Sequence, residues 1–86
     1  MTASELLPKI KKAKTITGNF HDDALLIVIE EVLSYLIDAG VKEKNITVGV
    51  VARGVSDLWD VPNGELSNYF IQRAKQLALK EDESDV

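Results

Sequence analysis

The pattern of hydrophobic and polar residues along the 86-residue chain predicts helices throughout. Four segments carry apolar side chains at the three- and four-residue spacing that places them on one face of a helix. They lie at about residues 3–13, 22–39, 47–59 and 67–79. The segments between them contain Gly, Pro or Asn, which interrupt helices. We therefore expect an all-α fold, a small bundle of about four helices with one long central helix.

The start of the first helix has two possible positions. Residues 2–5, Thr-Ala-Ser-Glu, have the form of a capping box and predict a helix that begins at Ala3. Pro8 favours a later start, because proline lacks the N–H of a helix interior and suits the first helical position. The sequence does not decide between them. In either case the core-facing residues are expected to be Leu6, Leu7 and Ile10.

The second helix is the longest and has a wide apolar surface. Asp22 and Asp23 favour its positive N-terminal end, and Gly40 suits the left-handed residue that ends many helices. Its apolar residues cover an arc of roughly 200°, more than the stripe of an ordinary surface helix. The helix is therefore either the central element of the bundle or packed against a second subunit as well. The arc consists of Leu25, Leu26, Val28, Ile29, Val32, Leu33, Tyr35, Leu36 and Ile37; the polar side holds Glu30, Glu31, Ser34 and Asp38, with Ile27 among them.

The third helix is predicted from about Thr47 to Trp59. β-branched residues and two glycines weaken this prediction, and a strand over residues 46–51 is an open alternative. Trp59 is either the large anchor of a small core or an exposed anchor of an interface.

The fourth helix begins near Ser67, a good N-cap residue. Leu66 before it and Ile71 after it have the spacing of a hydrophobic staple. Its inner stripe is expected to contain Phe70, Ala74 and Leu77. We expect residues 1–80 to form a single helical domain and the acidic residues 81–86 to be a disordered tail.

A chain of this length buries only about 60% of its unfolded surface, so its stability is marginal. It contains no cysteine, which excludes disulfides and thiolate metal sites and fits a reducing cytoplasm. Association with further copies is then the expected additional source of stability. The longest apolar run, residues 24–29, is far shorter than the roughly 20 residues of a membrane span, so we expect no membrane association.

The formal net charge of −4 is unevenly distributed along the chain. Residues 15–41 contain five acidic residues and no basic one, whereas residues 1–14 carry four lysines and a single acid. This balance lacks the basic footprint of a protein that binds duplex DNA. The lysines at positions 9, 11, 12 and 14 are best interpreted as a solvated helix face. Arg53, Asp57, Arg73 and Lys75 are expected to form surface salt bridges of little energetic value.

No arrangement of residues predicts catalysis. The single histidine, His21, precedes Asp22 and Asp23, but neighbouring side chains diverge by about 100° on a helix, so these residues are better explained as a favourable helix start than as a metal site. No serine has an evident histidine partner, and no glycine-rich phosphate loop follows a strand. We expect no enzyme activity, no catalytic or metal-binding residue and no cofactor.

Three stretches of the chain resemble the small head–tail connector, or head-completion adaptor, proteins of long-tailed bacteriophages. Residues 6–11 (LLPKIK) resemble the short opening helix, and residues 15–41 the linker and long second helix. Residues 53–59 together with 66–77 resemble the closing helical pair. Two departures are Asn68, where many members have Pro, and the short acidic tail. The resemblance covers nearly the whole chain and is carried by structural motifs.

The resemblance implies an α-helical adaptor that assembles as a ring of roughly a dozen subunits with head-to-tail interfaces. Such a ring docks under the phage portal protein after DNA packaging, meets stopper or tail proteins on its other side, and lets DNA pass without specific binding. The expected location is the neck of the virion, after synthesis in the host cytoplasm.

Three groups of residues are candidates for roles in such a ring. They are expected at the subunit interface, on the channel wall, where acids would repel DNA, and at the portal. The interface candidates are Ile27, Tyr35 and Trp59; the channel-facing acids are Glu30, Glu31 and Asp38; the tail candidates for portal contact are Glu81, Asp82, Glu83 and Asp85.

Two other classes compete with the connector interpretation. The third and fourth helices resemble a helix-turn-helix in outline, but Arg73 and Lys75 are too few for a DNA-binding regulator. A small helical protein-interaction module, binding one partner through the wide apolar helix, is the other alternative.

Overall fold

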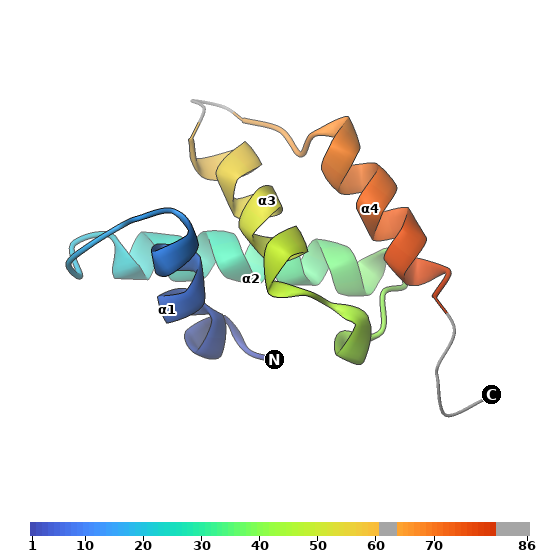
Figure 1. Cartoon of the computed structure of the whole chain (residues 1–86), viewed down its shortest axis with the longest axis horizontal. Helices are drawn as coiled ribbons and strands as arrows, with labels where there is room; N and C mark the ends of the chain where they lie inside the picture. The colour runs from blue at the N-terminus through green and yellow to red at the C-terminus, as the bar shows by residue number, and fades with distance from the viewer. Residues whose placement is uncertain (61–63, 81–86) are drawn as a thin grey trace.

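The computed structural model describes residues 1–60 and 64–80, which form four α-helices and one short 3-10 helix (Figure 1). The all-α prediction is confirmed, and the described residues contain no strand. The helices are α1 (Ala3–Ala13), α2 (Asp22–Asp38), η1 (Glu43–Asn45), α3 (Val48–Trp59) and α4 (Asn68–Ala78). The predicted acidic tail, residues 81–86, lies outside the described residues.

The long helix α2 runs along the longest axis of the molecule, and α1 and α3 cross it on one side (Figure 1). α3 also contacts α1 and α4, so α2 and α3 together join the whole bundle. One hydrophobic core lies between the helices. On α2 it takes the residues at three- and four-residue spacing, namely Leu25, Ile29, Val32 and Leu36. The wide apolar arc is narrower than predicted, because Ile37 is half exposed.

The structure decides where α1 begins. Thr2 is the N-cap, and its hydroxyl oxygen accepts a hydrogen bond from the Glu5 backbone N–H at 3.2 Å. The same hydroxyl donates to the Glu5 carboxylate at 3.0 Å. Pro8 lies inside the helix, so the exposed Ser4 carbonyl before it receives no helical hydrogen bond from residue 8. The capping interactions at Thr2 therefore outweigh the bond that Pro8 removes.

Both α1 and α2 end with a left-handed residue, but only α2 ends with glycine. Gly40 has φ 94°, and the N–H groups of Gly40 and Val41 donate to the carbonyls of Ile37 and Leu36. This pair of bonds is the Schellman motif that Gly40 predicts. The same two bonds close α1, where Thr15 takes the left-handed position with φ 56°. A β-branched residue is strained in that conformation.

α3 begins with a capped turn, which excludes the alternative strand at residues 46–51. The Thr47 hydroxyl accepts from the Val50 N–H at 3.1 Å, and Val48–Val51 are helical. Only Ile46 and the N-cap residue Thr47 keep an extended backbone in this stretch. The predicted N-cap of α4 is also confirmed, because the Ser67 hydroxyl accepts from the Phe70 N–H.

Gly54 marks the point where three helices come closest together. A Cβ atom added to Gly54 would lie 2.7 Å from a ring carbon of Phe70 on α4 and 2.8 Å from a methyl carbon of Val32 on α2. Both side chains are fully buried. Real Cβ atoms do not approach carbon so closely, so a side chain at position 54 would force α3 away from its neighbours.

We predict that Gly54→Ala destabilises the fold by about 2 kcal/mol. Overpacking of this kind costs up to about 3 kcal/mol, and the better helix propensity of alanine returns about 1 kcal/mol. Gly49→Ala is the matched control on the same helix, because its added Cβ meets only the Thr47 hydroxyl at 4.0 Å. The control should be neutral or stabilising. Urea unfolding of both variants tests the prediction, which is wrong if Gly54→Ala is as stable as the wild type.

We predict that Thr15→Gly stabilises the fold by about 1 kcal/mol, because it removes the cost of a left-handed β-branched residue. Thr17 lies two residues further along the same exposed connector and does not have a positive φ. Thr17→Gly should therefore lower the stability of the fold, because glycine gives the unfolded chain more conformational freedom. Thermal unfolding of the two variants should therefore shift the midpoint in opposite directions. A decrease for both would contradict the strain at Thr15.

Candidate functional site

The outer face of α2 is a surface that the other helices leave uncovered. Successive residues turn by about 100°, so the residues midway between the buried ones point away from α1 and α3. Within the described residues the acids of this face form no salt bridge. Ile27 and Ile37 lie among them and are 68% and 50% exposed. We call this surface the acidic face; its exposed residues are Asp23, Ile27, Glu30, Glu31, Ser34, Ile37 and Asp38.

The three predicted interface residues do not form one patch. Ile27 lies on the acidic face, whereas Tyr35 is partly buried with its ring 5.5 Å from that of Phe70. Trp59 is partly buried as well, and its ring centroid lies 5.8 Å from that of His21. The fully buried large aromatic residue of the core is Phe70, not Trp59. Of the three, Ile27 presents most of its side chain to a partner.

The three predicted channel-facing acids share the acidic face. Glu30, Glu31 and Asp38 are all exposed. A shallow hollow of about 340 Å³ beside Tyr35 and Ala39 is flanked by Glu31 and Asp38. The predicted tail acids, residues 81–86, lie outside the described part of the chain.

Phe20 is an exposed aromatic residue that sequence reasoning missed. It stands directly before α2 and is 93% exposed, with its ring edge against His21 at 4.9 Å between centroids. The spacing of Phe20 and Leu25 is that of a hydrophobic staple, which predicts burial of both. Only Leu25 is buried, so the staple does not form.

The four lysines of α1 and its C-cap divide into two pairs with different roles. Lys11 binds the Asp22 carboxylate at 2.8 Å and the Asn19 side-chain oxygen at 3.2 Å. Lys14 binds Asp60 at 2.6 Å and the Ser56 hydroxyl at 3.1 Å. Lys11 therefore links α1 to the start of α2, and Lys14 links it to the end of α3. Lys9 and Lys12 are exposed and make no salt bridge within the described residues.

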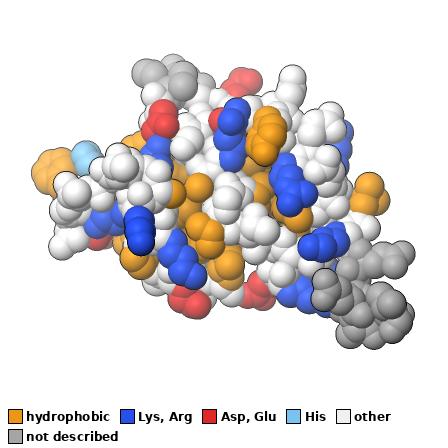
Figure 2. All heavy atoms as spheres, in the orientation of Figure 1, with side chains coloured by type: hydrophobic (Ala, Val, Ile, Leu, Met, Phe, Trp, Pro, Cys, Tyr) orange, Lys and Arg blue, Asp and Glu red, His pale blue; other side chains and the backbone are white. Residues whose placement is uncertain are grey.

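Basic side chains dominate the face that α1, α3 and α4 present (Figure 2). In that view Lys and Arg side chains are spread over these helices with hydrophobic side chains between them, and the acidic side chains lie mostly at the margins. The acidic face of α2 is turned to the other side, since α2 packs behind α1 and α3. Charge is therefore separated across the molecule.

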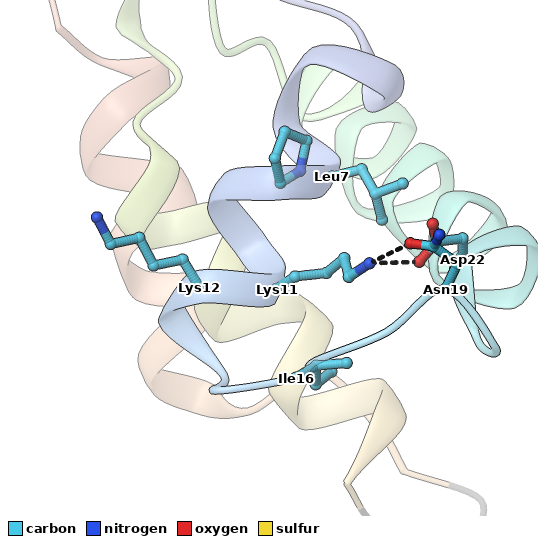
Figure 3. A pocket seen from close by; sticks show the side chains of 7 residues that line it. Leu7, Lys11, Lys12, Ile16, Asn19 and Asp22 are labelled. Carbon is cyan, nitrogen blue, oxygen red and sulfur yellow. Dashed lines mark hydrogen bonds and ion pairs between the residues drawn. The ribbon is translucent and has the colours of Figure 1, made fainter.

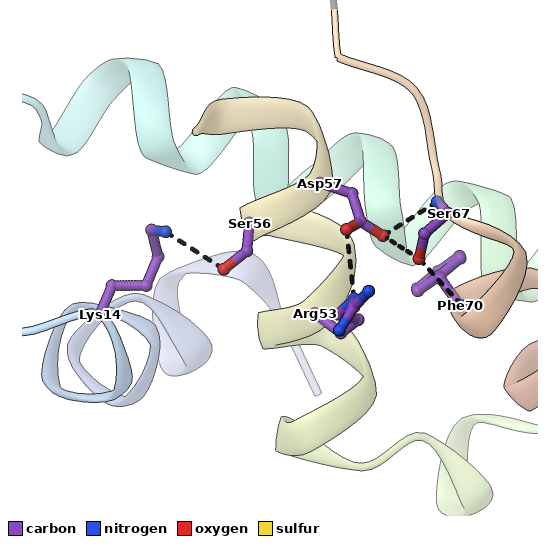
Figure 4. Close-up of polar contacts among 6 residues, drawn as sticks. All are labelled: Lys14, Arg53, Ser56, Asp57, Ser67 and Phe70. Carbon is purple, nitrogen blue, oxygen red and sulfur yellow. Dashed lines mark hydrogen bonds and ion pairs between the residues drawn. The ribbon is translucent and has the colours of Figure 1, made fainter. Parts of the chain in front are cut away.

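Asp57 joins α3 to α4 and is the most constrained acid of the described residues (Figure 4). One carboxylate oxygen accepts from the Ser67 hydroxyl at 2.6 Å and from the Ser67 N–H at 3.0 Å. The other accepts from the Arg53 guanidinium at 3.2 Å. Arg53 also lies over the Tyr69 ring, 5.0 Å from its centroid. The salt bridge expected from the sequence is present, and the carboxylate also holds the first turn of α4 through Ser67.

The contacts of Asp57 change its pKa in two opposing ways. Burial of the carboxyl group raises the pKa, while the two hydrogen bonds from Ser67 and the charge of Arg53 lower it. The lowering contacts outweigh the burial, and the pKa of Asp57 falls below its ordinary value of 3.8. The carboxylate therefore stabilises the folded state above about pH 4 and loses this effect as the pH falls through the lower, folded-state pKa.

The described residues hold no group of three His, Asp or Glu side chains placed to share a metal ion. None of their helices has the length and apolarity needed to cross a bilayer. Asn45 is the one buried polar side chain among them, and its amide nitrogen has no hydrogen-bond partner. What the arrangement offers is contact surface: an acidic face with apolar residues, and an opposite basic face.

Comparison of the chain with protein-family models, with curated proteins and with solved structures finds no match. The resemblance to phage connectors therefore supports a proposal about function and not membership of a family.

We predict that Asp57→Asn lowers the free energy of unfolding by about 1–2 kcal/mol at pH 7, because hydrogen bonds to a charged group are replaced by weaker ones. The gap between the variant and the wild type should narrow as the pH falls below about 4 and through the lowered folded-state pKa of Asp57, where the wild-type carboxylate becomes protonated. Asp38→Asn, on the exposed face of α2, is the control and should stay within about 0.5 kcal/mol of the wild type. Urea unfolding across this pH range measures both. An Asp57→Asn gap that does not narrow at all as the pH is lowered below 4 would contradict a role for the charge.

Proposed function

We propose that this protein is a structural head–tail connector of a tailed phage or prophage. In this proposal it forms a ring in the neck of the virion that docks to the portal and extends the DNA channel toward the tail. The proposal rests on the resemblance of residues 6–11, 15–41, 53–59 and 66–77 to such connectors. The chain acts by positioning and sealing, without a chemical reaction.

The observation that carries the proposal is the uncovered outer face of α2. The other helices pack on one side of the central helix, which leaves Ile27 and Ile37 exposed among acids. In this proposal the uncovered face, with Ile27 and Ile37 exposed, is a surface for another molecule. Copies of the same chain satisfy this need in a ring.

The acidic character of the molecule supports passage of DNA over binding of DNA. A surface with exposed Glu30, Glu31 and Asp38 repels phosphates. The three acids were predicted to face the channel, and their exposure is compatible with that position. Contact of residues 81–86 with the portal stays a prediction; deletion of these residues should weaken portal binding and leave the ring intact.

We predict that the purified chain forms closed rings of roughly a dozen copies, alone at high concentration or when the portal is added. Light scattering over a range of concentrations, with negative-stain microscopy of the same samples, measures the mass and the closure. A portal pull-down tests docking, and filter binding with duplex DNA should show no specific retention. A stable dimer that ignores the portal would contradict the connector and favour the protein-interaction module. Tight duplex binding would favour the DNA-binding regulator.

A further inference from the structure

The helical domain contains equal numbers of acidic and basic residues, but they lie on different faces. Residues 1–80 carry ten basic and ten acidic side chains. α2 contributes five acids and no base. The basic side chains are spread over the opposite face, on α1, α3 and α4 (Figure 2). Two copies of the chain can therefore bring opposite charges together only if different faces meet.

The exposed lysines of α1 are the basic residues best placed to meet a second copy. Lys9 and Lys12 lie one turn apart and make no salt bridge within residues 1–60 and 64–80. Arg53 is held by Asp57, and Arg73 donates to Gln76 at 3.2 Å. Glu30 and Glu31 on the acidic face are likewise unpaired within that part of the chain. The two pairs are complementary in charge.

An apolar groove lies beside Lys12. It has a volume of about 430 Å³ and lies between α1, the connector and the first turn of α2 (Figure 3). Leu7, Pro8 and Ile16 supply its apolar lining. The bonds from Lys11 to Asn19 and Asp22 bridge its side, as the dashed lines in Figure 3 show. The groove is thus fixed by the fold and has a cationic margin.

We infer that the acidic face of one copy docks on the α1 groove of the next, with Ile27 seated against Leu7, Pro8 and Ile16. Glu30 and Glu31 follow Ile27 by one turn and meet Lys12, which lines the groove, and Lys9, one turn before it on α1. This contact covers an isoleucine that is 68% exposed in the single chain and pairs four unpaired charges. Because the groove and the acidic face are different surfaces of one chain, the contact is heterologous and repeats from copy to copy.

This contact rests on the proposed ring and specifies the interface between its neighbouring subunits. We call this interface, between the acidic face and the α1 groove, the seam. The contact moves Glu30 and Glu31 from the channel wall to the seam. Asp38 lies about 10 Å further along α2 by helical rise and takes no part in the contact.

Charge reversal provides the test. Glu30→Lys with Glu31→Lys places bases opposite Lys9 and Lys12, and Lys9→Glu with Lys12→Glu places acids opposite Glu30 and Glu31. Each double variant should lose self-association by about tenfold or more, because like charges then face each other. The quadruple variant, and an equimolar mixture of the two doubles, should regain it, since every seam again pairs opposite charges. Sedimentation and negative-stain microscopy measure assembly, and circular dichroism confirms that each variant is folded.

Two matched controls separate the seam from general changes in charge or polarity. Lys42→Glu with Lys75→Glu makes the same change in net charge at exposed lysines outside the groove and should assemble normally. Ile27→Asp should abolish assembly, while Ile37→Asp, on the same face, should not.

The outcomes distinguish this inference from the proposed function. If both reversed doubles still form rings, the seam lies elsewhere and the connector proposal stands. Rings of Glu30→Lys with Glu31→Lys that assemble normally and retain DNA would place these residues in the channel and overturn the inference alone. Folded variants that fail to regain assembly on mixing would overturn it too. A wild-type chain that never assembles, with or without portal, would overturn both.

Discussion

The close approach of three helices at Gly54 is the constraint on which the rest of the structure depends. A Cβ atom at Gly54 would lie within 2.8 Å of both Val32 and Phe70, so α2, α3 and α4 converge at one residue of α3. In an 86-residue chain the buried surface is limited, and close convergence gives more contact for each residue. The direction of α4 then follows from two nearby anchors, the seated Phe70 ring and the bonds from Ser67 to Asp57.

Packing of the helices on one side of α2 also determines the functional surfaces. The same arrangement that completes the core leaves the other side of the longest helix without a cover. Three charged residues are paired within the domain, namely Asp57, Lys11 and Lys14. Among the charges that remain exposed without a salt bridge in the described residues are the acids of the outer α2 face and Lys9 and Lys12 of α1, which gives the domain two contrasting sides.

Local features were predictable from the sequence, whereas contacts between distant residues were not. Thr2, Gly40 and Ser67 act within one turn of their helix, so their capping roles could be recognised from neighbouring residues alone. Asp57 resembled a surface acid because its partner Ser67 lies ten residues away, on the other side of residues 61–63. The exposure of Phe20 depends on where the connector leaves the bundle. The candidate site was therefore predicted in part. The acids of α2 were recognised from the sequence, whereas the groove between α1, the connector and the first turn of α2 was not.

Separation of charge across the domain has a kinetic consequence as well. A neutral body with acids on one side and bases on the other carries an electric dipole across its thickness, whose field reaches beyond contact distance. At physiological ionic strength this reach is about 8 Å, enough to orient two copies during the last stage of diffusion. Copies then meet with unlike faces together more often than by chance, and added salt slows their encounter. The fold thus influences how quickly copies find one another before any of their atoms touch.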